Sequence, residues 1–357
     1  MSSLRAFQAS DIDPLCYPDD ISLLLLQSRR LEDVRLHFSP RMRREAEPSI
    51  SLQTYFGRCQ KACYSMKLKH LGMQNFFGVM AELMGSVFDP TTLTSVTFLD
   101  TFGGIGSGAS NIYVDETWKS LPPDLKVDTT RMRINEFSPQ LAEIIARNNN
   151  GLECIYFINT KHQGLDQPNR LITPTDTPPS NEEMTQLGKE YIYALTRHGH
   201  HGKSLRHLLL REEWTLSEDE VRNLVWHFPH LEQISLSVNS SSHNILCLLL
   251  PFLPKLRVVR LLMNGWLADL VQGGSHEERM ATMSVEICKV DAKDLQWIGL
   301  GDYVYRVGKH YQHVQKDGTV ETRREVTMGS LVDVHDVEIF AMDCLDLGAD
   351  PIAPFSP

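Results

Sequence analysis

The chain has 357 residues, of which 42% are apolar, so it can bury one large core or two of ordinary size. Its formal net charge of −10 argues against nucleic acid or an anionic membrane as a partner. The N-terminus lacks the pattern of a secretory signal, the apolar run at 21–26 is too short to span a bilayer, and the seven cysteines follow no disulfide framework, so we expect a protein of the cytoplasm or nucleus.

A leucine-rich pattern, L-x-x-L-x-L, recurs nine times along the chain. The three apolar positions are filled, in chain order, by Leu31, Val34 and Leu36; Leu68, Leu71 and Met73; Leu93, Val96 and Phe98; Thr129, Met132 and Ile134; Leu152, Ile155 and Phe157; Leu205, Leu208 and Leu210; Leu231, Ile234 and Leu236; Leu256, Val259 and Leu261; and Leu295, Ile298 and Leu300. The first positions are separated by 37, 25, 36, 23, 53, 26, 25 and 39 residues, and four of these steps fall within the roughly 20–29 residues of a leucine-rich repeat. The longer steps require insertions or an unrecognised repeat, and the fourth copy is weak because it opens on a polar residue.

Each copy predicts a short strand followed by a helix. The L-x-L part places alternate side chains on one face of a strand, toward a core. Helix-start signals lie between the strands: Ser217 and Glu220 form a capping box for a helix ending near Trp226, and Pro139 suits the first turn of another. A strand–helix unit of this size cannot bury its own apolar face, so the units must stack. We therefore expect one α/β leucine-rich-repeat solenoid over residues 1–357, a horseshoe with an inner parallel sheet and outer helices.

Two insertions and a C-terminal cap interrupt this regular pattern. Residues 161–183 contain four prolines among Thr, Asn and Asp, which predicts an exposed, mobile loop. A second insertion, residues 265–289, contains an amphipathic piece at 277–287. After the last copy, the Asp-Gly pair at 317–318 separates two runs that are typical of strands and predicts a β-hairpin. We expect a closing strand near 337–340 to complete a capping hairpin and strand over residues 301–345.

Several copies are entered from a helix through a turn residue directly before the first leucine, as in Phe228-Pro229-His230-Leu231. This entry, together with Leu295-Gln296-Trp297-Ile298-Gly299-Leu300-Gly301 and the hairpin and acidic tail after it, resembles the fungal F-box/leucine-rich-repeat proteins over about residues 21–347. The resemblance implies a substrate receptor of a cullin-type ubiquitin ligase, in which the repeats hold the target and the F-box recruits the ligase adaptor. It covers the repeat region only, since no segment of the sequence is recognisable as an F-box.

One glycine-rich segment offers an alternative of a different class. A predicted strand precedes the loop Gly103–Gly108, a pattern found in S-adenosylmethionine- or nucleotide-binding enzymes. That chemistry needs a helix to open directly after the loop, and the residues that follow predict none. We therefore favour a loop that leaves a repeat strand, and likewise a solvated loop at His198–His201 over a metal site. The sequence predicts no catalytic residue, no cofactor and no metal.

The repeat geometry also predicts which side chains face a partner. If the fourth and sixth positions of the pattern face the core, the third, fifth and seventh face the opposite side of the sheet. These positions carry five Arg and one Asp, a charge of +5 − 1 = +4 within a chain of −10, so we expect them to hold an acidic or phosphorylated protein segment. The alternative is a surface of ordinary solvated arginines. The predicted partner-binding residues are Arg35, Arg131, Arg133, Tyr156, His207, Arg211, Arg260 and Trp297.

Overall fold

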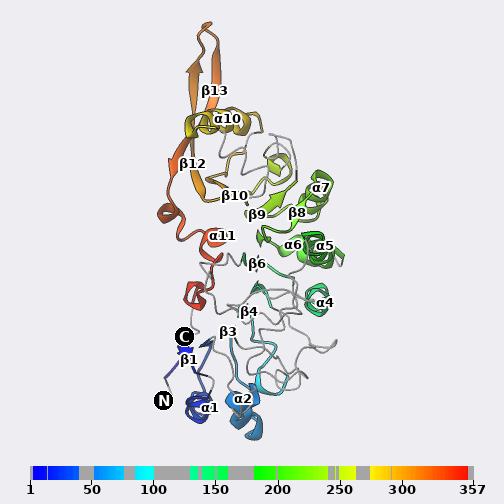
Figure 1. Cartoon of the computed structure of the whole chain (residues 1–357), viewed down its shortest axis with the longest axis vertical. Coiled ribbons are helices and arrows are strands. Elements are labelled where there is room, and N and C mark those ends of the chain that lie inside the picture. The colour runs from blue at the N-terminus through cyan, green and yellow to red at the C-terminus, as the bar shows by residue number, and fades with distance from the viewer. Residues whose placement is uncertain are drawn as a thin grey trace. The chain divides into compact units, whose positions relative to one another are not determined.

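The computed structural model divides into two compact units, and each is described by itself. Unit 1 comprises residues 1–152, 160–179 and 344–357, and unit 2 comprises residues 153–159 and 180–343. Figure 1 traces the chain. The structure describes residues 3–13, 15–39, 52–75, 85–99, 129–135, 139–148, 151–159, 181–197, 200–239, 246, 249–262, 274–290 and 292–352.

Unit 1 contains a parallel sheet whose strands follow one another in chain order. Its elements are β1 (Ala6–Ile12), α1 (Pro18–Gln27), β2 (Asp33–Phe38), α2 (Leu52–Lys61), β3 (His70–Gln74), β4 (Ser95–Leu99), β5 (Arg131–Ile134), α4 (Pro139–Arg147) and the 3₁₀ turn η5 (Leu347–Ala349). The strands pair in the register that the repeat predicts, since Val34 lies opposite Leu71 and Leu71 opposite Val96. The repeat does not predict β1, which adds a parallel strand beside β2.

Unit 2 also contains a sheet of parallel strands, and its last two strands are antiparallel. Its elements are β6 (Cys154–Phe157), α5 (Asn181–Arg197), α6 (His200–Ser204), β7 (His207–Leu209), β8 (Thr215–Leu216), α7 (Glu218–His227), β9 (Gln233–Val238), η3 (Leu250–Phe252), β10 (Val258–Leu261), α10 (His276–Lys289), β11 (Trp297–Leu300), β12 (Tyr303–Val314), β13 (Val320–Gly329), η4 (Leu331–Val334) and α11 (Glu338–Ala341). Strands β6, β7, β9, β10 and β11 are parallel neighbours, whereas β12 and β13 are antiparallel. Figure 1 shows α5, α6 and α7 on one side of these strands and α11 on the other.

The apolar positions of the repeat form the core. All of them are buried except Phe98, which is half-buried. The fourth copy, which is weak in the sequence, is a true strand with its polar first residue, Thr129, wholly buried. A mixed α/β fold with a mostly parallel sheet is therefore confirmed for each unit.

The helix and hairpin signals are confirmed where the structure describes them. Helix α7 begins after Ser217 with both hydrogen bonds of the predicted capping box. Helix α10 contains the amphipathic piece at 277–287 and carries a second capping box that starts at Ser275. Strands β12 and β13 form the predicted hairpin about the turn at Asp317-Gly318. Within the described residues, no helix is both long and apolar enough to cross a membrane.

Three local predictions are wrong. Residues 338–341 form helix α11 and not a closing strand, because the Glu338 carboxylate and the Ile339 backbone N–H bond to Gln233 on the face of the sheet and add no strand to its edge. Residues 181–183 of the predicted loop belong to α5, while 161–180 lie outside the described residues. His201 is not solvated: it is fully buried in α6.

Candidate partner-binding face

The eight predicted partner-binding residues lie on one side of the sheet in each unit. Seven are on strands at the predicted positions, and Arg211 lies two residues after β7. We call this side the polar face of each unit. Six of the eight side chains are buried, and only Arg131 and Trp297 are half-buried. In unit 2, residues 338–343 lie on this face, and in unit 1, residues 344–350 do. They belong to the C-terminal segment, residues 331–351, which holds six acidic residues and no Lys or Arg.

In unit 1, Arg35 holds the main chain of the C-terminal segment. Its Nη1 atom donates to the carbonyl oxygens of Leu347 and Asp350 at 2.7 and 2.8 Å. The Leu347 side chain packs against Gly72 on β3, where a Cβ atom would lie 3.4 Å from it. Because the polar face has no side chain at Gly72, the turn η5 can lie directly on the sheet.

Arg133 recognises the same segment through a carboxylate. Its Nη1 atom donates to Asp350 Oδ2 at 2.9 Å and to the Asp346 carbonyl oxygen at 3.0 Å. Its Nη2 atom donates to the Cys344 carbonyl oxygen. Both partners of the ion pair are almost wholly buried, with 1% and 3% of their side chains exposed. Arg35 and Arg133 therefore converge on Asp350, one through its main chain and the other through its side chain.

A row of buried, hydrogen-bonded side chains on β2, β3 and β4 holds Arg35 in place. Asp33 accepts from Arg35 Nε and Nη2 at 2.9 and 2.8 Å, and its Oδ1 atom lies 3.2 Å from His70 Nδ1. His70 Nε2 lies 3.3 Å from the Thr97 hydroxyl. Burial on its own would raise the pKa of Asp33, but the hydrogen bonds and charges of His70 and Arg35 lower that pKa to about 2. The carboxylate thus stays ionised and fixes the orientation of Arg35.

In unit 2, the carboxylate of Asp343 sits between two groups of the polar face. Arg260 on β10 donates to Asp343 Oδ2 at 2.8 Å and to the Ile339 carbonyl oxygen at 3.4 Å. The backbone N–H and side-chain amide of Asn159, just after β6, donate to Asp343 Oδ1 at 3.0 and 3.2 Å. Arg260 and Asp343 have only 9% and 6% of their side chains exposed, so this is a desolvated pair whose carboxylate accepts from both Arg260 and Asn159. Among the described residues, the buried Nε atom of Arg260 has no hydrogen-bond partner.

A second contact in unit 2 is made by Gln233 on β9. Its amide nitrogen donates to the Glu338 carboxylate, and its amide oxygen accepts from the backbone N–H of Ile339 at 3.1 Å. Phe340 lies over Gly299, where a Cβ atom would be only 2.9 Å from its ring, and the Arg260 guanidinium carbon lies 5.1 Å from the ring centroid. Helix α11 is thus bound by hydrogen bonds, by charge and by an aromatic contact.

Four of the other predicted residues, all in unit 2, make different contacts. The Tyr156 hydroxyl lies 2.9 Å from His207 Nδ1, and both side chains are buried. Arg211 pairs with Glu213 at 2.9 Å, and the Trp297 ring lies against Gly329 of β13. These four residues support the sheet of unit 2.

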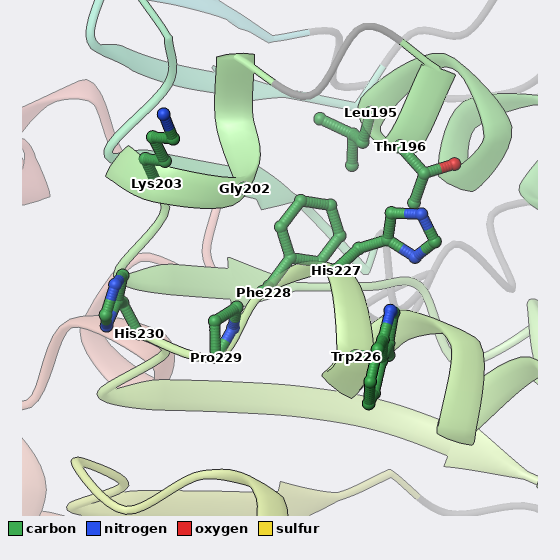
Figure 2. Close-up of a pocket in the computed structure, with 9 residues that line it drawn as sticks. All are labelled: Leu195, Thr196, Gly202, Lys203, Trp226, His227, Phe228, Pro229 and His230. Atoms are coloured by element: carbon green, nitrogen blue, oxygen red, sulfur yellow. The ribbon is translucent and has the colours of Figure 1, made fainter.

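A pocket of about 240 Å³ lies on the helical side of unit 2 (Figure 2). Its lining residues come from α5, α6 and the end of α7 with the turn that follows: Leu195, Thr196, Gly202, Lys203, Trp226, His227, Phe228, Pro229 and His230. None of the eight predicted residues lines it. A Cβ atom at Gly202 would lie 2.7 Å from the His227 carbonyl oxygen, so glycine allows the close approach of α6 and α7. Trp226 is 77% exposed and marks a second surface that is chemically distinct from the polar face.

The alternative cofactor loop, Gly103–Gly108, lies outside the described residues. In the described part of the chain, no three His, Cys, Asp or Glu side chains gather in a way that could hold a metal ion.

Sequence reasoning missed Asn159 and the acidic residues that the face binds. Asn159 follows its strand by two positions and lies beyond the repeat pattern. The available signal for Asp343 and Asp350 is the charge of the C-terminal segment, which is opposite to that of the polar face. No protein-family model matches the chain, and no curated protein is significantly similar to it.

Proposed function

We propose that this chain is a non-catalytic protein-interaction scaffold of the cytoplasm or nucleus, built as a leucine-rich-repeat solenoid, whose polar face binds an acidic segment of a partner protein. The parallel strands in repeat register support the solenoid architecture. The resemblance to F-box/leucine-rich-repeat proteins supports the narrower proposal of a ubiquitin-ligase substrate receptor. In that proposal the polar face holds the target.

The observation that carries the proposal is the pairing of Arg260 with Asp343. A strand arginine of the polar face binds the carboxylate of a separate chain segment at 2.8 Å, with Asn159 on the opposite side of the same carboxylate. Ordinary solvated arginines lack such fixed, water-excluded partners. Arg133 repeats the arrangement in unit 1 with Asp350. The polar face therefore already binds carboxylates, which are the groups that an acidic partner segment would present.

Affinity capture with mass spectrometry tests the proposal. Three full-length chains are compared: wild type, Arg133→Glu with Arg260→Glu, and Trp226→Ala. We expect the partners recovered with the wild type to be retained by Trp226→Ala, because Trp226 lies on the helical side, and to be lost from the double arginine variant. Recovery of a cullin adaptor tests the narrower receptor role.

A partner set that is unchanged by the double arginine substitution would overturn the proposal, and so would a loss confined to Trp226→Ala. Circular dichroism shows whether the double variant still folds. If the double variant does not fold, chemical cross-linking of the wild-type complex is used in place of the capture comparison. Cross-links that map only to α5, α6 and α7 would then contradict a polar-face site.

A further inference from the structure

We infer that residues 338–343 are a displaceable internal ligand of unit 2, and that the partner carries the same kind of sequence: a carboxylate, an apolar pair that includes an aromatic residue, and a second carboxylate five positions after the first. This inference rests on the proposed function and names its partner chemistry. The sequence of the internal ligand is Glu338-Ile339-Phe340-Ala341-Met342-Asp343.

The first argument is that the polar face distinguishes the side chains of this segment. Gln233 binds both the carboxylate of Glu338 and the backbone N–H of Ile339. Arg260 binds the carboxylate of Asp343 and lies over the Phe340 ring. The contacts therefore depend on the order of residues in the ligand, as expected for a recognition site and not for a non-specific cover.

The second argument concerns the groups that form the site. Gln233, Arg260 and Asn159 come from three different parts of the chain and are 6, 7 and 8% exposed. Burying a guanidinium and an amide is unfavourable unless a ligand satisfies them. A carboxylate at the Asp343 position accepts from Arg260 and Asn159 whether it belongs to this chain or to another.

The third argument is that the segment has little structure of its own. Helix α11 is only four residues long, and an isolated helix of that length is unstable in water. Of the residues that precede it, Leu331 and Val332 are 54% and 77% exposed, whereas Val334 is wholly buried. Between Val332 and α11, the Asp333 carboxylate accepts hydrogen bonds from Ser330, which is a neighbour in the sequence and not part of the sheet face. The helical turn at 338–341 is therefore ordered by its contacts with the face, so it can leave the face only by losing its own helical structure.

The fourth argument is energetic. A buried ion pair contributes little net free energy over its solvated parts, so exchanging one acidic ligand for an equivalent one is close to neutral. What favours the internal ligand is its effective concentration, which is in the millimolar range for a short tether. A partner with the same contacts must compete with that concentration, and weakening the internal ligand should raise the affinity for the partner.

The test uses a labelled peptide of residues 331–343 and the full-length chain. Fluorescence anisotropy compares the wild type with an opened variant that carries Phe340→Ala and Asp343→Ala. We expect the opened variant to bind the peptide on the order of tenfold or more tightly than the wild type, because the competing internal ligand is weakened. A control peptide with the same two substitutions should bind neither protein, and adding Arg260→Met to the opened variant should abolish binding.

The inference is overturned if the folded opened variant binds the peptide no more tightly than the wild type does. Equal binding of the control peptide also overturns it. If the opened variant does not fold, hydrogen exchange on the wild type decides. We expect the Ile339 amide, which donates to Gln233, to exchange faster than the amides of β9 and β10 through local opening. Exchange only at the rate of global unfolding would make the segment a permanent part of the fold and overturn the inference.

These outcomes can be separated from those of the proposed function. Arg-dependent capture of a protein together with a failed peptide experiment leaves the scaffold function standing and overturns the displaceable ligand. Peptide binding to the opened variant without any Arg-dependent protein partner supports the recognition chemistry and overturns the scaffold function.

Discussion

Arg133 on β5 and Asp350, 217 residues further along the chain, form an ion pair of 2.9 Å with both side chains buried in unit 1. Neither charge has access to bulk water, so the loss of hydration must be compensated by the opposite charge. The Asp346 and Cys344 carbonyl oxygens satisfy further N–H groups of the same guanidinium. The pair fixes the C-terminal segment of unit 1 at one position on the polar face.

A double-mutant cycle on this pair should show strong coupling. We expect Arg133→Met and Asp350→Asn each to lower the free energy of unfolding by about 3–5 kcal/mol, because each leaves an uncompensated buried group. The double variant should lose less than the sum, with a coupling of roughly 0.5–3 kcal/mol. Urea titrations of the four chains measure it. Additive losses would mean that the pair does not interact in solution.

Asp33 should make stability depend on pH in the acid range. Its pKa of about 2 in the folded protein lies below the ordinary value of 3.8, so its contribution is complete above about pH 5 and is lost progressively as the pH falls toward 2. The full effect is about 2 kcal/mol, and roughly half of it is lost by pH 3. Urea titrations at pH 5, 4 and 3 measure it, with Asp33→Asn as the comparison. The variant should be less stable at pH 5 and lose less on acidification, and parallel losses in both proteins would contradict the assignment.

Two buried threonines should respond to valine substitution with opposite signs. Among the described residues, the Thr129 hydroxyl has no hydrogen-bond partner, so Thr129→Val should raise the free energy of unfolding by about 1 kcal/mol. The Thr97 hydroxyl lies 3.3 Å from His70 Nε2, and Thr97→Val should lower that free energy by about 1 kcal/mol. Thermal melts of the two variants provide the measurement. The same sign in both would show that the hydrogen-bond difference does not control stability.

Two helical glycines should also respond in opposite ways to alanine. A Cβ atom at Gly188 in α5 would lie 2.5–2.9 Å from the buried Trp214 side chain, which is itself packed against Phe157 and Tyr191. The overlap costs about 1–3 kcal/mol and outweighs the gain in helix propensity of about 1 kcal/mol. At Gly57 in α2 the nearest atom is 3.5 Å away, so Gly57→Ala should be stabilising. Stabilisation by Gly188→Ala would mean that Trp214 can move aside.

Local patterns explain why the strands could be predicted. The spacing of Leu231, Ile234 and Leu236 specifies a strand and its buried face within six residues, and the same spacing in each copy fixes the register. Strand β1 escaped this reasoning because Gln8, Ser10 and Asp11 interrupt its apolar residues. Its strand conformation is stabilised by the backbone hydrogen bonds of its parallel pairing with β2, which the local pattern does not report.

The site could be predicted only in part, for a related physical reason. Arg35, Arg133 and Arg260 were identifiable because strand alternation determines which side of the sheet a residue faces. Their partners lie 312, 217 and 83 residues away, and no local periodicity reports such a contact. The burial of these arginines was therefore not predictable, although their preference for carboxylates was.

The long sequence separation between Arg133 and Asp350 also has a consequence for biosynthesis. A ribosome adds about 5–20 residues per second, so roughly 10–40 seconds pass between the synthesis of β5 and that of its acidic partner. During that interval the strands of unit 1 can pair, but the polar face remains hydrated and its arginines stay exposed to other anionic segments. Unit 1 can therefore complete its fold only after Asp350 has been synthesised. Until then, the arginines of the nascent chain lack the carboxylate that they bind in the folded protein.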